Sequence, residues 1–415
     1  MRLTRSLQAL RHRHFRVYMI GWFLSVVGSQ VQQWAIMWHV WELTESSAMV
    51  GALGLARVVP LIAFSLLGGV VADRVDRRKI MLATQGGMAL VSIVLWSLSS
   101  SGLLTVWIIY VLVSLHASVR AFDGPARQSL LVNLVPERDF ASAVRVSGVS
   151  WRLADVLGPL ITGFFITRFE SGVSVCYAFN AVSFAAIIVS LLLLPSPPRE
   201  EPESRLTGLR GLGGFIADGA RFVWKNDVVR AALLLDFWAT FFSTADALLP
   251  AFAGDIFQLG GSGFGVLGSS IAVGALIGAV SMAFHPPRRS QGLWVLYAVA
   301  AYGLATILFG LSTNMAIACV LLAATGAADM VSTVLRQTIR QLATPDNMRG
   351  RMTSFSMIFQ ISGPQLGDYE AGLVGRLCGE RISVVIGGSV CLLLAAKWRK
   401  SSPLVKFDAP ELPTG

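Results

Sequence analysis

Long apolar stretches recur along the whole of this 415-residue sequence, separated by polar connections. Each holds about 17 residues or more, which is long enough for a helix to cross the ~30 Å hydrocarbon core of a bilayer. The chain is 54% hydrophobic and only 14% charged, whereas soluble domains carry about a quarter charged residues. The sequence therefore predicts an all-α polytopic membrane protein whose partner is the lipid bilayer.

The net charge of +10 follows the expected topology. Lysine and arginine gather in alternate connections, and the intervening ones hold only Arg168, Arg376 and Arg381. Because basic loops stay on the cytoplasmic side, we expect both termini to be cytoplasmic and the number of spans to be even. The basic balance is thus explained without a nucleic-acid partner.

No pattern in the sequence indicates an enzyme, a metal or a cofactor. The four cysteines are scattered in or near apolar segments, and the five histidines lack metal-ligand spacing. No phosphate-binding G-x-x-x-x-G-K-[ST] loop is present. The first apolar stretch lacks a cleavage site, so we expect it to remain as the first helix.

The order of the apolar stretches predicts two six-helix bundles. The first bundle is expected over 1–194, a cytoplasmic linker with an amphipathic helix over 195–230, the second bundle over 231–397 and a cytoplasmic tail over 398–415. The twelve helices are expected near 17–41, 48–71, 80–100, 103–122, 142–168, 173–194, 231–253, 264–284, 292–311, 314–335, 352–375 and 382–397.

The two halves share short matches at one offset. Arg127-Gln-Ser is followed at nine positions by Pro-Glu, and Arg336-Gln-Thr is followed in the same way by Pro-Asp; the same offset superposes Gly158 on Gly367. These matches indicate a duplication. Two halves related by an axis along the membrane normal place a substrate site at the midplane between them.

The connection between the second and third predicted helices reads G-V-V-A-D-R-V-D-R-R-K. It resembles the major facilitator superfamily signature G-x-x-x-D-R-x-G-R-R/K, and five residues fall at the right spacing: Gly69, Asp73, Arg74, Arg77 and Arg78. Asp76 stands where the family has glycine, so the turn is expected to form differently. A solvated basic turn is the alternative interpretation.

The resemblance also implies gating roles at the cytoplasmic ends of the helices. Asp123, with Arg127 one turn later, ends the fourth predicted helix, and in the family an acid there pairs with the second arginine of the signature, here Arg77, as a latch. Asp73 is expected to face the N-terminal end of the eleventh predicted helix, whose free N–H groups favour an anion.

The fifth predicted helix contains A-D-V-L-G-P-L-I-T-G. This segment is similar to the superfamily's antiporter signature G-x-x-x-G-P-x-x-G-G, with Gly158, Pro159 and Gly163 matching and Ala154 and Thr162 as small substitutes. In the family the motif marks exporters. The same small residues could serve only as a packing face.

Charged residues inside the predicted helices are candidates for proton coupling, because charges at that depth are costly and face a cavity or a partner. Asp155 and Arg152 lie one turn apart. One hypothesis is that Asp155 takes up and releases the proton while Arg152 stabilises its charged form or binds an anionic substrate group; the other is a permanent structural pair. Asp329 is a further candidate.

Polar and aromatic residues elsewhere could line a substrate cavity: Gln30, Gln33, Trp34, Arg57 and Asp236. The alternative is that they pair or snorkel near helix ends, and that most tryptophans anchor helices at the membrane interface.

The chain is identified as a member of the major facilitator superfamily, and D-G-P-A-R-Q-S with the Gly-Pro of the fifth predicted helix resembles its bacterial siderophore (enterobactin-type) exporter and macrolide efflux branch. The resemblance implies a monomeric drug:proton antiporter of the bacterial inner membrane. Such a protein expels an amphipathic small molecule, a drug, macrolide or siderophore, in exchange for protons. The alternatives are a proton-coupled metabolite importer of the same fold and a non-transporting receptor or scaffold.

Overall fold

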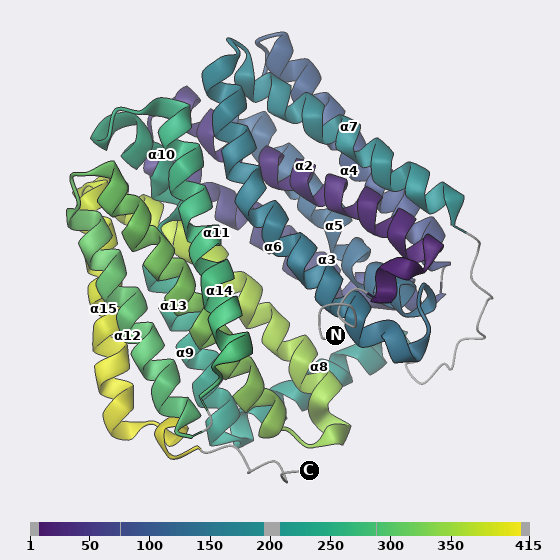
Figure 1. Cartoon of the computed structure of the whole chain (residues 1–415), viewed down its shortest axis with the longest axis vertical. Coiled ribbons are helices and arrows are strands. Elements are labelled where there is room, and N and C mark those ends of the chain that lie inside the picture. Colours follow the sequence, from purple (N-terminus) through teal and green to yellow (C-terminus); the bar gives the residue numbers. More distant parts are fainter. Residues whose placement is uncertain (1–7, 75, 195–207, 288, 408–415) are drawn as a thin grey trace. The chain divides into compact units, whose positions relative to one another are not determined.

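The computed structural model describes residues 8–74, 76–194, 208–287 and 289–407, and within these ranges the chain is helical without a strand. Twelve helices in these ranges correspond to the twelve predicted spans (Figure 1). They are α2 (Arg13–Thr44), α3 (Ser47–Arg74), α4 (Arg77–Ser100), α5 (Val106–Asn133), α6 (Glu137–Arg168), α7 (Gly172–Leu193), α9 (Asp227–Ser243), α11 (Gly260–Phe284), α12 (Gln291–Leu311), α13 (Met315–Leu342), α14 (Arg349–Cys378) and α15 (Glu380–Ser401).

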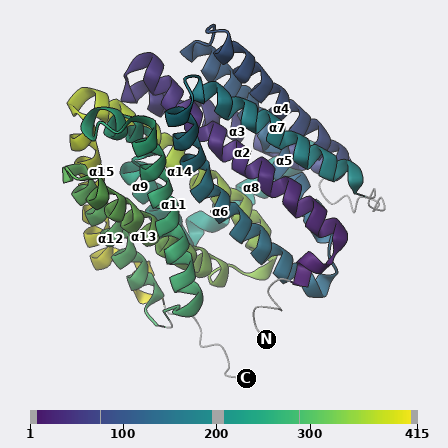
Figure 2. The same cartoon turned by 45° about the horizontal axis from the view of Figure 1, so that its top comes forward.

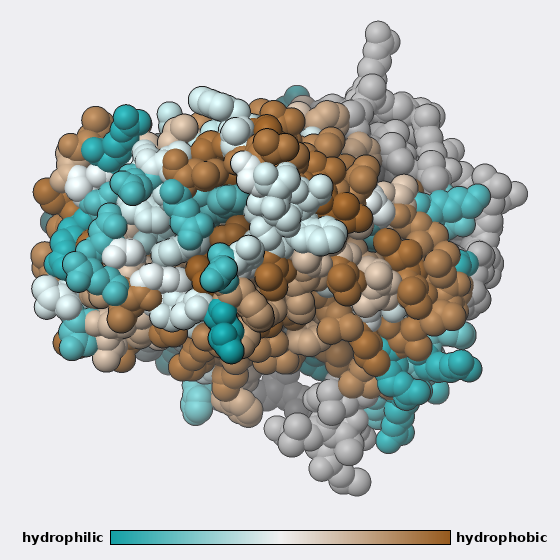
Figure 3. All heavy atoms as spheres, turned by 90° about the horizontal axis from the view of Figure 1, so that it is seen from above, coloured by the Kyte–Doolittle hydropathy of each residue, from teal (hydrophilic) through white to brown (hydrophobic). Residues whose placement is uncertain are grey.

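Ten stretches of the described chain are long and apolar enough to cross a membrane, judged by length and composition. The other two of the twelve helices, α2 and α14, are more polar along part of their length but have 32 and 30 residues. Large apolar side chains such as Val182 and Leu393 are about 70% exposed, and apolar residues cover much of the surface seen in Figure 3. An all-α polytopic membrane fold, as the sequence predicts, is confirmed.

The seventh predicted helix is interrupted, which the apolar pattern did not predict. Instead of one helix over 231–253, α9 ends at Ser243 and is followed by η2 (Asp246–Leu248), α10 (Leu249–Ala251) and the π-helical turn η3 (Phe252–Ile256). Pro250 explains part of this break, because proline has no N–H and its ring clashes with the carbonyl four residues earlier in a continuous helix.

The chain forms two compact units, and each is built from several separate segments of the sequence. The first unit contains α2, α4 to α7, α3 from Ala56 onward and the start of α11 (Gly260–Gly265). The second contains the beginning of α3 (through Leu55), the helices from α9 onward and α8 (Gly208–Lys225). Neither unit is a single continuous piece of the chain. The division predicted from the sequence, in contrast, consists of two continuous bundles, 1–194 and 231–397.

In the first unit, α2 packs against α7 and α6, and α4 packs against α5 and α7, as Figure 2 also shows. Asn180 of α7 is fully buried, and its side-chain amide donates to Gln32 Oε1 of α2 at 3.0 Å and to Ser92 Oγ of α4 at 3.1 Å. A buried amide is stable only when it is hydrogen-bonded. This network therefore fixes the position of α2 relative to α4 and α7.

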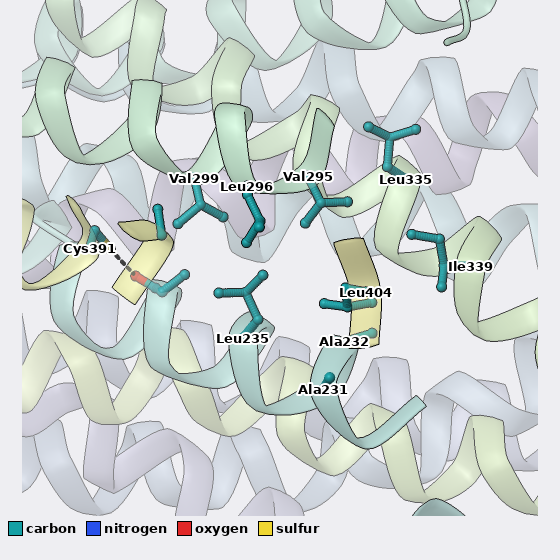
Figure 4. Close-up of a cluster of buried hydrophobic side chains, with 12 residues drawn as sticks. Ala231, Ala232, Leu235, Val295, Leu296, Val299, Leu335, Ile339, Cys391 and Leu404 are labelled. Carbon is teal, nitrogen blue, oxygen red and sulfur yellow. Dashed lines mark hydrogen bonds between the residues drawn. The ribbon is translucent and has the colours of Figure 1, made fainter. Parts of the chain in front are cut away.

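In the second unit, α12 packs against α13 and α15, and α9 packs against α14. A cluster of buried apolar side chains fills the space between α9, α12 and α13 (Figure 4). The Cys391 thiol of α15 donates to the carbonyl oxygen of Ala239 at 3.3 Å beside this cluster. The thiol is thus a small buried group, consistent with its apolar surroundings.

Two glycines let the backbones of α11 and α13 pack directly against each other. A Cβ atom on Gly274 would lie 1.8 Å from the carbonyl oxygen of Ala323, and one on Gly326 would lie 2.0 Å from the carbonyl oxygen of Ile271. Small residues at helix crossings in membranes gain close backbone packing. The crossing has no room for any larger side chain.

We predict that Gly326→Ala lowers the free energy of unfolding by about 1–3 kcal/mol, because the new methyl group forces α11 and α13 apart. Gly86 is the matched control, since it is also helical but a Cβ atom added to it would have no neighbouring atom within 4 Å. Gly86→Ala should leave stability unchanged or raise it slightly. Thermal unfolding of the two purified variants in detergent measures the difference, and equal behaviour would contradict the close crossing.

Candidate functional site

The connection between α3 and α4 places the signature residues at the ends of two helices. Gly69, Asp73 and Arg74 lie in the last turns of α3, where the side chains are outside the described part of the structure, and Arg77 begins α4. Asp76 caps α4, because its carboxylate accepts the backbone N–H of Arg78 at 2.9 Å. The aspartate that departs from the family pattern thus has a structural use.

Arg78 also connects two helices. Its guanidinium donates to the carbonyl oxygen of Leu192, in the last turn of α7, at 2.8 Å. The free carbonyl groups at a helix C-terminus favour a cation. One signature arginine therefore stabilises the end of α7.

Asp123 of α5 is held by α4. Its Oδ1 atom accepts from the Thr84 hydroxyl at 3.0 Å and from the Gln85 amide at 2.9 Å, and the Ser25 hydroxyl of α2 donates to Gln85 Oε1 at 3.4 Å. These bonds join three helices around one carboxylate. The latch between Asp123 and Arg77 stays a prediction, since the hydrogen bonds to Asp123 come from Thr84 and Gln85.

A row of two neighbouring aromatic rings with a cation at each end runs beside this network. The guanidinium of Arg127 lies 5.1 Å from the centre of the Trp22 ring, and Trp22 lies 6.3 Å from Trp151. The guanidinium of Arg120 in turn lies 6.0 Å from the Trp151 ring. Cation–π attraction of this kind contributes about 0.5–1 kcal/mol at exposed sites and more when desolvated. The row holds α2, α5 and α6 in register.

Asp155 of α6 lies between two donors. The side-chain amide of Gln30 on α2 donates to Asp155 Oδ1, and Arg152 Nη1 lies 3.4 Å from Asp155 Oδ2. The side chain of Asp155 keeps 19% of its surface exposed and that of Arg152 keeps 36%. The carboxylate is thus paired but keeps part of its surface exposed.

The glycine-proline motif of α6 sets the distance from α6 to α2. A Cβ atom on Gly158 would lie 2.5 Å from the Cβ atom of Gln30, so only glycine allows this approach. Thr162 strengthens the contact, because its hydroxyl donates to the carbonyl oxygen of Val31 at 3.0 Å. The motif thus positions the amide that binds Asp155.

The far end of the motif meets the start of α11. A Cβ atom added to Gly163 would lie 2.7 Å from the carbonyl oxygen of Gly261 and 2.9 Å from Cα of Gly265. A Cβ atom added to Gly265 would in turn lie 2.6 Å from the carbonyl oxygen of Pro159. Backbone therefore packs directly on backbone at this crossing. The small residues of the motif are used along its whole length.

Four of the five predicted cavity residues occupy different surroundings. Gln30 binds Asp155, and the Trp34 ring lies 5.2 Å from Phe264. Gln33 and Arg57 are half-buried. Of these four, the structure brings only Gln30 into the group around Asp155.

Asp236, the fifth predicted cavity residue, is buried in the second unit. Its Oδ1 atom lies 2.8 Å from Arg336 Nη2 and its Oδ2 atom accepts from Arg340 Nη1 at 3.2 Å. The side chains of the two arginines are 1% and 4% exposed. In this structure the carboxylate of Asp236 neutralises two buried cations of α13, and its place in a substrate cavity stays a prediction.

Asp329 lies at the edge of this buried group. Its Oδ1 atom is 3.7 Å from Arg336 Nη2 and its side chain is 42% exposed. Arg336 is thus shared between a buried and an exposed carboxylate. Asp329 is accessible to protons, but the structure places it in the second unit and not with Asp155.

A family model described as "Transmembrane secretion effector" matches residues 4–414, nearly the whole chain. The chain belongs to the transmembrane secretion effector family. This family consists of transporters of the major facilitator superfamily, so the protein is a multi-pass membrane transporter and not an enzyme.

Relatives of this transmembrane secretion effector include proteins described as "Enterobactin exporter EntS" from Shigella boydii and Escherichia coli. Each is 28% identical over 371 residues, which cover 88% of this chain and 85% of the relative. Homology on this scale supports secondary transport.

Solved structures of transporters have the same fold at low sequence identity. A bacterial homologue of the human lysosomal transporter Spinster matches with a TM-score of 0.71 and 15% identity over 93% of this chain and 95% of its own. The nucleoside transporter NupG (TM-score 0.69, 14% identity, 95% and 100% covered) and a D-xylose–proton symporter (0.69, 14%, 97% and 98%) match similarly.

Several site residues of this transmembrane secretion effector were missed by sequence reasoning. Trp22, Trp151 and Arg120 were not singled out, nor were Arg336 and Arg340 as partners of Asp236. A signal was present for the last two, because arginines four residues apart share one helix face. An apolar helix with two arginines on one face requires an acid from another helix.

We predict that Asp236→Ala lowers the free energy of unfolding by about 3–5 kcal/mol, because it leaves Arg336 and Arg340 buried without their counter-charge. Asp227→Ala on the same helix is the control, since its pair with Arg230 at 2.7 Å is exposed and contributes about 0–1 kcal/mol. Unfolding by SDS in mixed micelles measures both. Similar losses in the two variants would contradict the assignment of Asp236 as a buried ion-pair centre.

Proposed function

We propose that this protein exports an amphipathic small molecule, such as a siderophore, macrolide or drug, from the cytoplasm across a bacterial inner membrane in exchange for protons. The two six-helix halves would expose the substrate to each side in turn. The observation that carries the proposal is the position of Asp155, which is paired by Gln30 and Arg152 but still partly exposed.

Export direction is supported by the motif of α6. Gly158, Pro159 and Gly163 match the antiporter signature, and their backbone packing on neighbouring helices uses the small residues that the signature specifies. The relatives described as enterobactin exporters are consistent with the same direction. An importer of a metabolite is the second candidate, because the symporter and nucleoside transporter share the fold.

Proton coupling is attributed to Asp155 for a chemical reason. When Asp155 is ionised, Arg152 and the Gln30 amide neutralise and hydrogen-bond it. Protonation removes the attraction to Arg152, so that the charge of this arginine is no longer balanced by Asp155. A single proton would therefore change both the packing of α2 on α6 and the charge offered to a substrate. Asp329, beside Arg336, is the second candidate carboxylate.

The gating residues enter the proposal as contacts at the helix ends. Arg77 and Asp123 would form the cytoplasmic latch in one state, and Asp73 would face the start of α14. In the state described here Asp123 is satisfied by Thr84 and Gln85, so the latch would form when this carboxylate exchanges these two donors for Arg77. Monomeric operation and cytoplasmic termini belong to the same proposal.

We predict that Asp155→Asn abolishes substrate-driven proton movement while substrate binding is retained, because the amide cannot exchange a proton. Proteoliposomes with a trapped pH dye measure the movement during addition of siderophores, macrolides or cationic dyes. Asp227→Asn is the matched control, since it removes an exposed carboxylate of α9. Proton movement that survives in Asp155→Asn would transfer the role to another carboxylate, and silence of the wild-type protein across the panel would contradict export.

We predict that Gly158→Ala lowers the same proton flux about tenfold, because displacing α2 from α6 moves Gln30 away from Asp155 and small misplacements at such a site are costly. Gly148→Ala on the same helix is the control, since no atom lies within 4 Å of its Cβ position. Equal fluxes in the two variants would show that the motif does not act through the Gln30–Asp155 contact.

A further inference from the structure

Arg120 lies near the middle of α5 and is exposed. Its guanidinium lies over the Trp151 ring at 6.0 Å from the ring centre, and among the described residues it has no hydrogen bond and no ion pair. A guanidinium carries five N–H donors. A cation at this depth of an apolar helix is costly unless it meets a partner or water, so its open donors call for a ligand.

The carboxylates near Arg120 are already satisfied by other groups. Asp155 and Asp123 lie within electrostatic range of Arg120. Asp155 is bound by Gln30 and Arg152, whereas Asp123 accepts from two side chains of α4. Each aspartate thus lowers the electrostatic cost of Arg120 without occupying its hydrogen-bond donors.

The surroundings of Arg120 hold further positive charge. Arg57 of α3 and Arg120 both act electrostatically on His116, one turn before Arg120. The Nε2 atom of His116 is buried and has no hydrogen-bond partner in the part of the chain that the structure describes. Arg57 thus adds a second positive charge near this part of α5.

Aromatic rings lie beside the guanidinium of Arg120. Trp151 lies against Arg120 on one side and 6.3 Å from Trp22 on the other, and Trp22 carries Arg127 over its ring. A guanidinium stacked on an indole keeps its N–H edge free for a planar acidic group. The partly exposed Trp151 offers apolar surface next to that edge.

We propose that Arg120 binds the acidic group of an amphipathic organic anion, a carboxylate or a group of similar geometry, whose apolar ring lies along Trp151. This inference rests on the proposed export function and specifies the class of substrate that the first unit accepts. A carboxylate forms two parallel hydrogen bonds with one guanidinium. Arg152 would add a second cation when Asp155 is protonated.

The experiment compares two ligands of the same ring and opposite charge, 2-naphthoate and 2-naphthylmethylammonium. Calorimetric titration uses the whole protein in nanodiscs of zwitterionic lipid, so that neither ligand is attracted by lipid charge. The wild-type protein should bind naphthoate at least about tenfold more tightly than the cation, a clear difference in binding free energy. A preference for the cation, or none, would overturn the proposal without recourse to any variant.

Substitutions of Arg120 then test whether this residue binds the naphthoate. Arg120→Gln should weaken naphthoate binding about tenfold and leave the cation unaffected or better bound, whereas Arg120→Lys should retain part of the affinity because it keeps the charge but loses the paired geometry. Arg168→Gln removes one charge at the exposed end of α6 and should change nothing. Unchanged naphthoate binding in Arg120→Gln would overturn the assignment.

The outcome is separable from that of the proposed function. If the wild-type protein couples proton movement to export of a cation and ignores naphthoate, export stands and the anion site is wrong. If naphthoate binds through Arg120 but no tested anion or cation moves protons in proteoliposomes, the anion site stands and proton-coupled export is wrong.

Discussion

A charge inside an apolar helix must be neutralised by another charge or remain in contact with water, and the polar architecture of both units follows from this constraint. Asp236 meets it by complete burial between two arginines of α13. Asp155 is neutralised by Arg152 and hydrogen-bonded by Gln30, but part of its surface remains exposed. Breaking the first arrangement leaves uncompensated buried charge, whereas the second can change its protonation without exposing a buried cation. The degree of burial thus separates a structural pair from one suited to chemistry.

Small residues make these pairs possible, because a side chain reaches a neighbouring helix only if the two backbones approach closely. Gly158 permits the contact that brings Gln30 to Asp155, and Gly274 with Gly326 permits the crossing of α11 and α13. In lipid no large hydrophobic force drives helices together, so close packing and hydrogen bonds carry the association. The motif that resembles an antiporter signature is therefore also a packing motif, and its two interpretations do not compete.

Features that depend on one stretch of sequence could be predicted, and those that join distant stretches could not. The apolar runs predicted the long helices, and the spacing of Arg152 and Asp155 predicted a pair because three residues make one helical turn. The contact of Gln30 with Asp155, and the burial of Asp236 against Arg336, depend on which helices become neighbours. A linear pattern carries no such information. The break after Ser243 was missed because an apolar composition continues through Pro250.

The duplicated pattern places an arginine at corresponding positions of the two halves, yet the halves use it differently. Arg127 lies over Trp22 of α2, the first predicted span of its half, and Arg336 pairs with Asp236 of α9, the first predicted span of the other. An aromatic ring attracts a cation but leaves its hydrogen-bond donors free, whereas a buried carboxylate occupies them. The first half consequently keeps open hydrogen-bond donors on Arg120 and a partly exposed carboxylate on Asp155. In the second half Asp236 is buried between two arginines, whereas Asp329 beside them remains exposed. Under the proposed function, Asp155 is therefore the first carboxylate to test for proton exchange and Asp329 the second.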